Sequence, residues 1–227
     1  MARCLFLKNP GGQKMRIYIC GDSTASVFDP EKTRMVSWGQ LLGDYLPEAE
    51  IHNHAMAGRS TKTFLQEGRL DALKGEIGAG DLLLIQFAHN DEGEKPERHT
   101  EPEEFGRNLE RFIRFGRECG AVPILVTPIC IRSWKDGKLQ PSHGPYLAEM
   151  RKTAQKEKTE LIDLYEESYR IVAEAGEEES KRYYMHTGPG EEPGYPEGKQ
   201  DDTHTRRPSA EKYAAYVARK LLERKNT

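Results

Sequence analysis

The sequence predicts an α/β protein in which a five-stranded parallel sheet lies between two layers of helices, a three-layer α/β/α sandwich. Short apolar runs of strand length recur along the 227 residues, and stretches whose apolar residues lie three or four positions apart separate them. The runs are continuously apolar and do not alternate with polar residues, which is typical of strands buried on both faces. A ligand crevice is then expected beyond the carboxyl ends of the strands.

Five apolar runs are predicted as strands, in an order that alternates with helices along the chain. The clearest is DLLLIQF, residues 81–87, and the weakest is the run at 50–54. The remaining three are 16–20, 122–127 and 160–163. Their lengths of four to seven residues are too short for buried helices, so a sheet is the better interpretation.

The segments between these strands carry helical periodicity. Helices are predicted at 38–46, 103–119, 145–158 and 165–175. In the second of these, Phe105, Leu109, Phe112 and Ile113 form one apolar stripe. The last helix is expected to begin at Pro208, because proline is favoured in the first turn, and to run through Leu221.

Composition limits the classes of partner. The formal net charge of -3 and the pI near 6.2 give no basic surface, so neither nucleic acid nor a membrane is expected as a partner. No stretch approaches the length of a membrane span, and the apolar run before Lys8 is too short for a signal peptide, so a cytoplasmic location is expected. The cysteines have no CxxC spacing, and no disulfide is expected. The oligomeric state stays open.

One domain is predicted over residues 15–227, preceded by a flexible extension at 1–14 that ends in the structure-breaking Pro10-Gly11-Gly12. Two further segments lie outside the sheet-and-helix plan. Nine of the fifteen residues at 90–104 are charged, which is typical of a solvated loop. Residues 176–207 form a long loop rich in Gly, Pro and Glu, whose tyrosines indicate that it packs against the body or contacts a ligand.

A candidate nucleophile follows the first predicted strand, in the stretch Gly21-Asp22-Ser23. Because Gly21 lets the backbone turn, Ser23 is expected at the carboxyl edge of the sheet, where open α/β sheets bind ligands. A helix-capping serine is the alternative interpretation.

A serine hydroxyl needs a base, and the base needs an acid to orient it. Of the seven histidines, His204 has the most suitable neighbours, in Asp201-Asp202-Thr203-His204 directly before the last helix. The spacing of three lets one turn of backbone bring the Asp201 carboxylate to the imidazole, whereas Asp202 is expected to point away. A helix-capping histidine, or a metal ligand together with His186, are the alternatives.

Two other strand ends supply candidate oxyanion donors. Gly58, in NHAMAGRS after the second strand, offers a backbone N–H, and Asn90, in FAHND after the third, offers a side-chain amide. Each alone would be an ordinary turn residue. Since all four candidates follow strands or precede the last helix, they are expected at one edge of the sheet.

This ordered set of motifs resembles the SGNH hydrolases, which are named for their Ser, Gly, Asn and His. More narrowly, NHAMAGRSTKTF, FAHND and YPEGKQDDTHT are similar to the rhamnogalacturonan acetylesterase branch. The resemblance extends from about residue 16 to the last helix. It implies a flavodoxin-like sandwich and a serine esterase that removes O-acetyl groups from pectin-derived oligosaccharides without a cofactor or metal.

Carried over by position, the resemblance implies Ser23 as the nucleophile, His204 as the base and Asp201 as its orienting acid. The oxyanion donors would be Gly58, Asn90 and the backbone N–H of Ser23. One position departs from the family pattern, since Ala88 stands where a glycine is usual. We expect that glycine to serve close packing only, in which case a methyl group is tolerated.

Other enzymatic and non-enzymatic alternatives stay open. The same triad would serve a lysophospholipase or thioesterase, although the polar loops argue against long acyl chains. A catalytically impaired carbohydrate-binding relative is expected only if Ala88 displaces Asn90. Arg59 and His89 are candidates for contacts to the sugar, and Arg59 is equally a candidate for holding its own loop.

Overall fold

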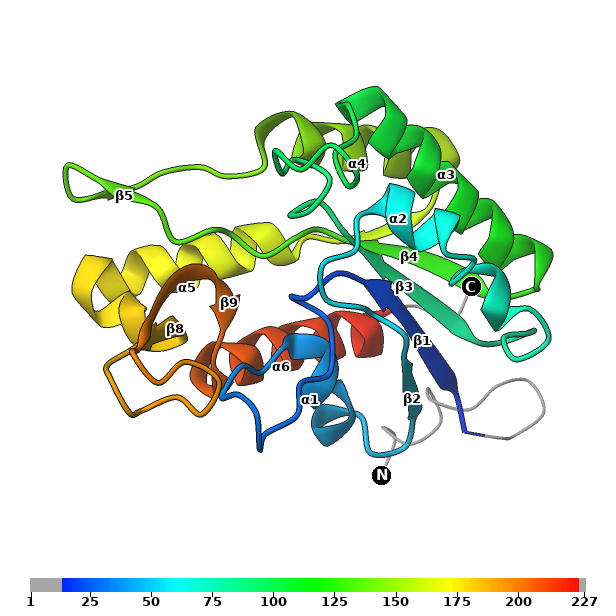
Figure 1. Ribbon diagram of the computed structural model, residues 1–227. Helices are drawn as coiled ribbons and strands as arrows, with labels where there is room; N and C mark the ends of the chain where they lie inside the picture. Colours follow the sequence, from blue (N-terminus) through cyan, green and yellow to red (C-terminus); the bar gives the residue numbers. More distant parts are fainter. Residues whose placement is uncertain (1–13, 225–227) are drawn as a thin grey trace.

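A computed structural model describes residues 14–224, and its centre is one sheet of five parallel strands (Figure 1). The strands lie in the order β2-β1-β3-β4-β7, and every pair of neighbours is parallel. Their bounds are Arg16–Gly21 for β1, Glu50–Asn53 for β2, Leu82–Gln86 for β3, Val122–Val126 for β4 and Glu160–Ile162 for β7. The predicted parallel sheet is therefore confirmed, with each strand within one or two residues of its expected bounds.

Helices cover both faces of the sheet, as the sandwich prediction requires (Figure 1). One layer holds α1 (Trp38–Tyr45), α5 (Leu164–Glu179) and α6 (Arg207–Glu223). The other holds α2 (Thr61–Gln66), α3 (Pro102–Glu118) and α4 (Gly144–Glu157). Only α2 had no predicted counterpart, because a six-residue helix is too short to show a periodic pattern.

Alternate side chains of each strand enter different cores. In β1, Ile17 and Ile19 pack with the layer of α1, α5 and α6, whereas Tyr18 and Cys20 pack with the layer of α2, α3 and α4. All four are at most 1% exposed. Burial on both faces is the physical reason why the strand sequences are continuously apolar.

The long loop expected at 176–207 is partly regular. It forms the short helix η2 (Ser180–Tyr183) and an antiparallel hairpin of β8 (Tyr184–Thr187) and β9 (Lys199–Thr205). Helix α5 also runs four residues beyond its predicted end, across a break at Gly176, where φ is 79°. The hairpin is attached to the body through Tyr183, whose carbonyl oxygen accepts from Arg206 N at 2.9 Å and from Ser209 Oγ at 2.6 Å.

Two small elements complete the described chain. A second hairpin of β5 (Trp134–Lys135) and β6 (Lys138–Leu139) projects from the body, and a single turn, η1, spans Asp71–Leu73 (Figure 1). No helix within residues 14–224 is long and apolar enough to span a membrane. Cys20, Cys119 and Cys130 are free thiols, and the predicted extension at 1–14 lies outside the described residues except for Lys14.

Candidate active site

Ser23 lies in a tight turn directly after β1, at the carboxyl edge of the sheet. The turn is closed by Asp22, whose Oδ1 accepts from Thr24 N at 2.9 Å and from Thr24 Oγ1 at 2.8 Å. Gly21 is required where the strand ends, since a Cβ there would stand 2.8 Å from the carbonyl oxygen of Gln86. Ser23 is largely buried, with 6% of its surface exposed.

The imidazole of His204 bridges Ser23 and Asp201, three residues that the sequence analysis had selected. His204 Nε2 lies 2.9 Å from Ser23 Oγ, and His204 Nδ1 lies 2.8 Å from Asp201 Oδ2. A carboxylate can only accept, so Nδ1 carries the proton and donates it to Asp201. Nε2 is then left with a lone pair that accepts from the Ser23 hydroxyl.

A bulge in β9 presents this histidine. Tyr184 and Met185 are adjacent in β8, but they pair with Thr205 and Asp201, so residues 202–204 protrude from the hairpin. Within the bulge, Asp201 Oδ1 accepts from the backbone N–H groups of Thr203 and His204, each at 2.9 Å. The expected turn between Asp201 and His204 is thus formed by an aspartate that binds the two amides following it.

The charge of Asp201 is stabilised by its surroundings. Burial opposes its ionisation, but the hydrogen bond and charge of His204 and the two backbone N–H groups outweigh burial, and they lower the pKa of Asp201 well below its usual value. Lys199 Nζ lies 3.2 Å from Asp201 Oδ2 and adds a cationic partner. Asp201 is therefore ionised in the folded protein at neutral pH.

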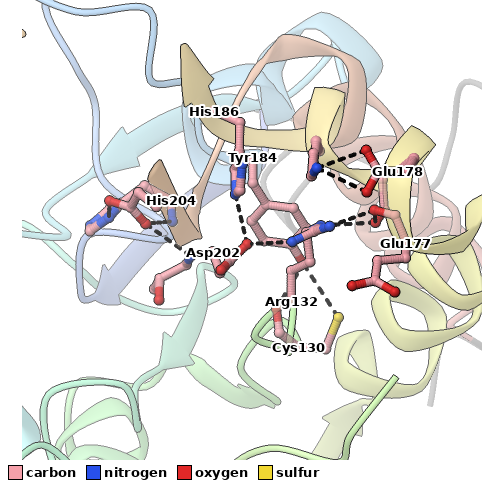
Figure 2. A network of polar contacts seen from close by, with 12 residues as sticks. Cys130, Arg132, Glu177, Glu178, Tyr184, His186, Asp202 and His204 are labelled. Atoms are coloured by element: carbon pink, nitrogen blue, oxygen red, sulfur yellow. Dashed lines mark hydrogen bonds and ion pairs between the residues drawn. The ribbon is translucent and has the colours of Figure 1, made fainter. Parts of the chain in front are cut away.

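Asp202 points away from His204, as expected, and takes part in a separate network. Figure 2 shows its carboxylate between His186 and Arg132. Its Oδ1 lies 2.7 Å from His186 Nε2 and accepts from Arg132 Nη1 at 2.8 Å. Arg132 is 6% exposed, and it also donates to Ser180 Oγ and to the carbonyl oxygen of Glu177. This arginine therefore fastens the bulge of β9 to the end of α5.

The segments that carry Gly58 and Asn90 are hydrogen-bonded to the nucleophile turn and to each other. Met56 N donates to the carbonyl oxygen of Gly21 at 2.9 Å, which places the Gly58 loop against the end of β1. Asn90 Nδ2 donates to the carbonyl oxygen of Arg59 at 3.1 Å. Gly58 has a φ of 78°, a conformation that favours glycine. Both candidate donors thus lie at the edge of the sheet that holds Ser23.

The expectation for Ala88 is wrong. Its φ is 153°, in a range that L-residues rarely adopt, so a glycine here would serve backbone conformation and not only close packing. The positive φ of Ala88 accompanies a tight turn directly after β3. In this turn Glu92 N donates to the carbonyl oxygen of Ala88 at 2.9 Å. Asn90 nevertheless keeps its contact with the Gly58 loop.

Arg59 and His89, the two candidates for contacts to a sugar, both contact other parts of the protein. Arg59 holds its own loop, with Nε 3.0 Å from Glu67 Oε1 and Nη1 3.1 Å from the carbonyl oxygen of Ala57. The side chain of His89 is 6% exposed and faces Asp22, with 3.5 Å between Nδ1 and Oδ2. Burial, together with the neighbouring His143, lowers the pKa of His89. The proposed sugar contact of His89 is therefore wrong because the ring lies under the nucleophile turn.

A buried carboxylate joins the two candidate oxyanion loops. Asp91 Oδ1 accepts from Thr61 N and from Thr100 Oγ1, both at 3.1 Å, and from the hydroxyl of Thr61. Burial raises the pKa of Asp91 to about 7 despite these hydrogen bonds. The start of α2, just after Gly58, is thereby fixed against the end of β3.

Metal ligation has no support among the described residues. Within residues 14–224 there is no group of three or more His, Cys, Asp or Glu side chains placed to hold an ion. His186, the alternative partner of His204, binds Asp202 instead. His52 and His54 both stack on the ring of Tyr18, with centroids 4.6 Å and 5.9 Å away.

Sequence reasoning missed two charged residues of this site. Lys199 lies two positions before Asp201 on β9, and the period of two in a strand would have placed both side chains on one face. Arg132 carries no comparable signal, because it lies in a connection distant in sequence and meets Asp202 only through the fold.

Comparisons with known proteins agree with the motifs. The model of the GDSL-like lipase/acylhydrolase family matches residues 19–204. The chain is 38% identical to the probable rhamnogalacturonan acetylesterase YesY of Bacillus subtilis (strain 168) over 91% of its length and 92% of the relative. It is 37% identical to the rhamnogalacturonan acetylesterase RhgT of the same organism, over 92% of this chain and 90% of that one.

Solved structures show the same architecture. The crystal structure of YxiM from Bacillus subtilis superposes with a TM-score of 0.77 at 28% identity, over 92% of this chain and 57% of that longer protein. Axe2, an acetylxylan esterase of Geobacillus stearothermophilus, superposes with a TM-score of 0.64 over 97% of this chain and 98% of that one. Because identity to Axe2 is only 11%, that likeness concerns the fold alone.

Proposed function

Because the chain belongs to the GDSL-like lipase/acylhydrolase family, we propose that it is a serine esterase that removes O-acetyl groups from oligosaccharides derived from rhamnogalacturonan. The observation that carries this proposal is the hydrogen-bonded series of Ser23, His204 and Asp201. The substrate class comes from the named acetylesterases, which are similar over nine-tenths of the chain. An acetylated oligosaccharide is thus the proposed partner.

In the first half of the reaction, Ser23 Oγ attacks the acetyl carbonyl carbon while its proton passes to His204 Nε2. Asp201 stabilises the imidazolium that forms, because its ionised carboxylate accepts from Nδ1–H. The carbonyl oxygen becomes negatively charged and is bound by the backbone N–H groups of Gly58 and Ser23 and by Asn90 Nδ2. His204 then gives its proton to the departing sugar oxygen, which leaves an acetyl-Ser23 ester.

In the second half, water takes the place of the sugar alcohol. His204 removes a proton from the water, which attacks the acetyl carbon, and the same donors bind the oxyanion again. Collapse of this intermediate returns the proton to Ser23 Oγ and releases acetate. The protein groups in both halves are the three side chains of the triad and the three oxyanion donors.

The decisive test is the loss of activity in Ser23→Ala, measured as acetate release from 4-nitrophenyl acetate and from acetylated rhamnogalacturonan oligomers. The small substitution keeps the turn intact, so thermal unfolding should match the wild type while turnover disappears. Hydrolysis by Ser23→Ala at the wild-type rate would exclude Ser23 as the nucleophile. Covalent labelling of the wild-type serine by a fluorophosphonate provides a second readout.

Asn90→Ala examines the oxyanion site separately. Loss of one such donor costs on the order of a hundredfold in kcat. A loss of less than about threefold would mean that the amide of Asn90 does not reach the oxyanion. We expect the larger effect, since the Asn90 amide lies against the Gly58 loop.

Substrate range distinguishes the acetylesterase from related activities. Acetate esters should be hydrolysed faster than octanoate esters, and acetylated rhamnogalacturonan oligomers faster than acetylated xylan oligomers. The reverse order on the first pair would favour a lipase or thioesterase. The cytoplasmic location expected from the sequence stays a prediction, and it would imply oligosaccharides and not polymer as the substrate.

A further inference from the structure

The charged segment after Asn90, expected to be a plain solvated loop, folds back over the proposed oxyanion site. Its two ends are joined where Thr100 N donates to the carbonyl oxygen of Asp91 at 3.0 Å. Tyr146 OH of α4 holds the same end by donating to the carbonyl oxygen of Thr100 at 2.6 Å. Within the loop, a turn at residues 95–99 directs Arg98 toward the sheet edge, with Arg98 N donating to the carbonyl oxygen of Lys95 at 2.9 Å.

Arg98 lies against both candidate oxyanion donors. Its Nη1 donates to Asn90 Oδ1 at 2.8 Å. A Cβ built on Gly58 would stand 3.5 Å from the same nitrogen. The side chain is 24% exposed, and the nearest carboxylate oxygen, on its neighbour Glu97, lies 3.8 Å away. The hydrogen bond to Asn90 is therefore its shortest polar contact with another element of the site.

This contact determines which way the Asn90 amide points. A guanidinium can only donate, so the atom it binds must be the carbonyl oxygen of the side chain. The NH2 group then faces the Gly58 loop, where one N–H donates to the carbonyl oxygen of Arg59 at 3.1 Å. The other N–H is the one that the proposed mechanism directs to the oxyanion. A flipped amide would present an oxygen there, which would repel the developing negative charge.

The backbone just before Asn90 has an unusual conformation. Ala88, two residues earlier, has a φ of 153°, which an L-residue adopts only when its surroundings impose it. That conformation places the backbone of Asn90 but does not set which way its side-chain amide is turned, which depends on hydrogen-bond partners such as Arg98. We propose that Arg98 is a positioning residue that fixes the orientation of the Asn90 amide, so that its N–H and not its oxygen faces the oxyanion.

The inference rests on the proposed function, since it assumes an oxyanion at this site. It predicts that Arg98→Met lowers kcat on the order of tenfold on 4-nitrophenyl acetate, with KM changed less than about twofold, because the amide is needed in the transition state and not for binding. Arg98→Lys, which keeps a donor, should recover most of the loss. Arg170→Met, an exposed arginine on α5, is the matched control and should behave as the wild type.

A double-mutant cycle with Asn90→Ala is the decisive experiment. If Arg98 acts through Asn90, Arg98→Met should change kcat by less than about twofold in the Asn90→Ala background, where no amide remains to orient. Equal losses in both backgrounds would overturn the proposal. A rise in KM confined to uronate-containing substrates, with kcat unchanged, would also overturn it and would make Arg98 a substrate-carboxylate contact.

The two levels of failure can be told apart. If Ser23→Ala remains active, the proposed function fails, and the role of Arg98, which assumes that oxyanion, fails with it. If Ser23→Ala is inactive and the cycle is additive, only the role of Arg98 fails. Circular dichroism and thermal unfolding of Arg98→Met and Arg98→Lys establish that both are folded, and Arg98→Gln supplies a third variant of similar length.

Discussion

The pKa of each carboxylate at this site depends on how deeply it is buried and on which groups donate hydrogen bonds to it. Asp201 and Asp91 are both carboxylates, yet their pKa values move in opposite directions. Asp201 accepts from His204 and two backbone amides, which overcomes the effect of burial and lowers its pKa. Asp91 is buried more completely and faces only neutral donors, so burial dominates and raises its pKa to about 7. The first carboxylate binds the proposed base, His204, and the second joins the loops that carry the proposed oxyanion donors.

The raised pKa of Asp91 predicts a pH dependence of stability. The folded state binds this proton more tightly than the unfolded chain, where the value is 3.8, so the free energy of unfolding should fall as pH rises from about 4 to about 7. Asp91→Asn keeps an acceptor at Oδ1 and does not titrate, so this part of the slope should vanish. Urea unfolding at several pH values measures it.

Asp44→Asn, at an exposed position in α1, serves as the control for Asp91→Asn and should keep the wild-type slope. Identical slopes in wild type and Asp91→Asn would contradict the assignment. For Asp201 the sign is reversed: its contribution to stability is present above the unfolded pKa and is lost as pH falls further.

Among the elements, the β8–β9 hairpin carries Asp201 and His204, the acid and the base of the proposed triad, and its attachment decides where they lie. The bulge at 202–204 projects His204 toward Ser23, whereas Asp202 on the same bulge is held by Arg132 (Figure 2). Arg132 also donates its backbone N–H to the carbonyl oxygen of Asp202 at 2.9 Å. A strand edge with a bulge is weakly restrained by its own ladder, so this arginine limits its movement.

Arg132→Met should therefore affect both stability and activity. Removing the guanidinium breaks an ion pair in which Arg132 is buried but the Asp202 side chain is 43% exposed, so the cost should lie between those of a surface pair and a buried pair, at about 2 kcal/mol. We expect kcat to fall as well, because the distance between His204 and Ser23 is no longer fixed. Arg207→Met, which removes an exposed pair with Glu211, should cost less than about 1 kcal/mol. Equal unfolding free energies for the two variants would argue against the restraint.

At the scale of the whole molecule, a rigid sheet supports loops of different rigidity. Strands β1, β3 and β4 occupy the middle of the sheet and are covered by helices on both faces (Figure 1). Every candidate catalytic group is presented beyond a strand end or on the hairpin. This arrangement separates stability, which comes from the two cores, from chemistry, which comes from the rim.

Hydrogen exchange should follow that division. Amides of β1, β3 and β4 are expected to exchange slowest, at rates set by global unfolding, and amides of 188–198 at the tip of the hairpin fastest. Exchange measured by mass spectrometry on overlapping peptides tests this order. Protection at 188–198 equal to that of β3 would show that the hairpin belongs to the same cooperative unit as the sheet.

Most of the fold followed from patterns that are local in the chain. Continuous apolar runs located all five strands, and helical spacing located α1, α3, α4, α5 and α6, because each pattern records how one element is buried. Ser23, Asp201 and His204 were selected together since nucleophile, base and acid require those residue types, and the structure brings them into contact. The hairpin in 176–207 escaped prediction because its strands are short, polar and paired across a long loop.

The sequence by itself determined the sheet, its helical layers and the residue types of the candidate site. Burial produces apolar patterns within single elements, and the chemistry requires particular residue types in short motifs. Only the tertiary structure decided that Arg132 binds Asp202, that Arg98 donates a hydrogen bond to Asn90 and that Ala88 has a positive φ. The two side-chain contacts join different segments of the chain. The local sequence of a charged residue does not distinguish a solvated loop from a loop that folds back over the site. The geometry of these contacts depends on where the whole chain places them.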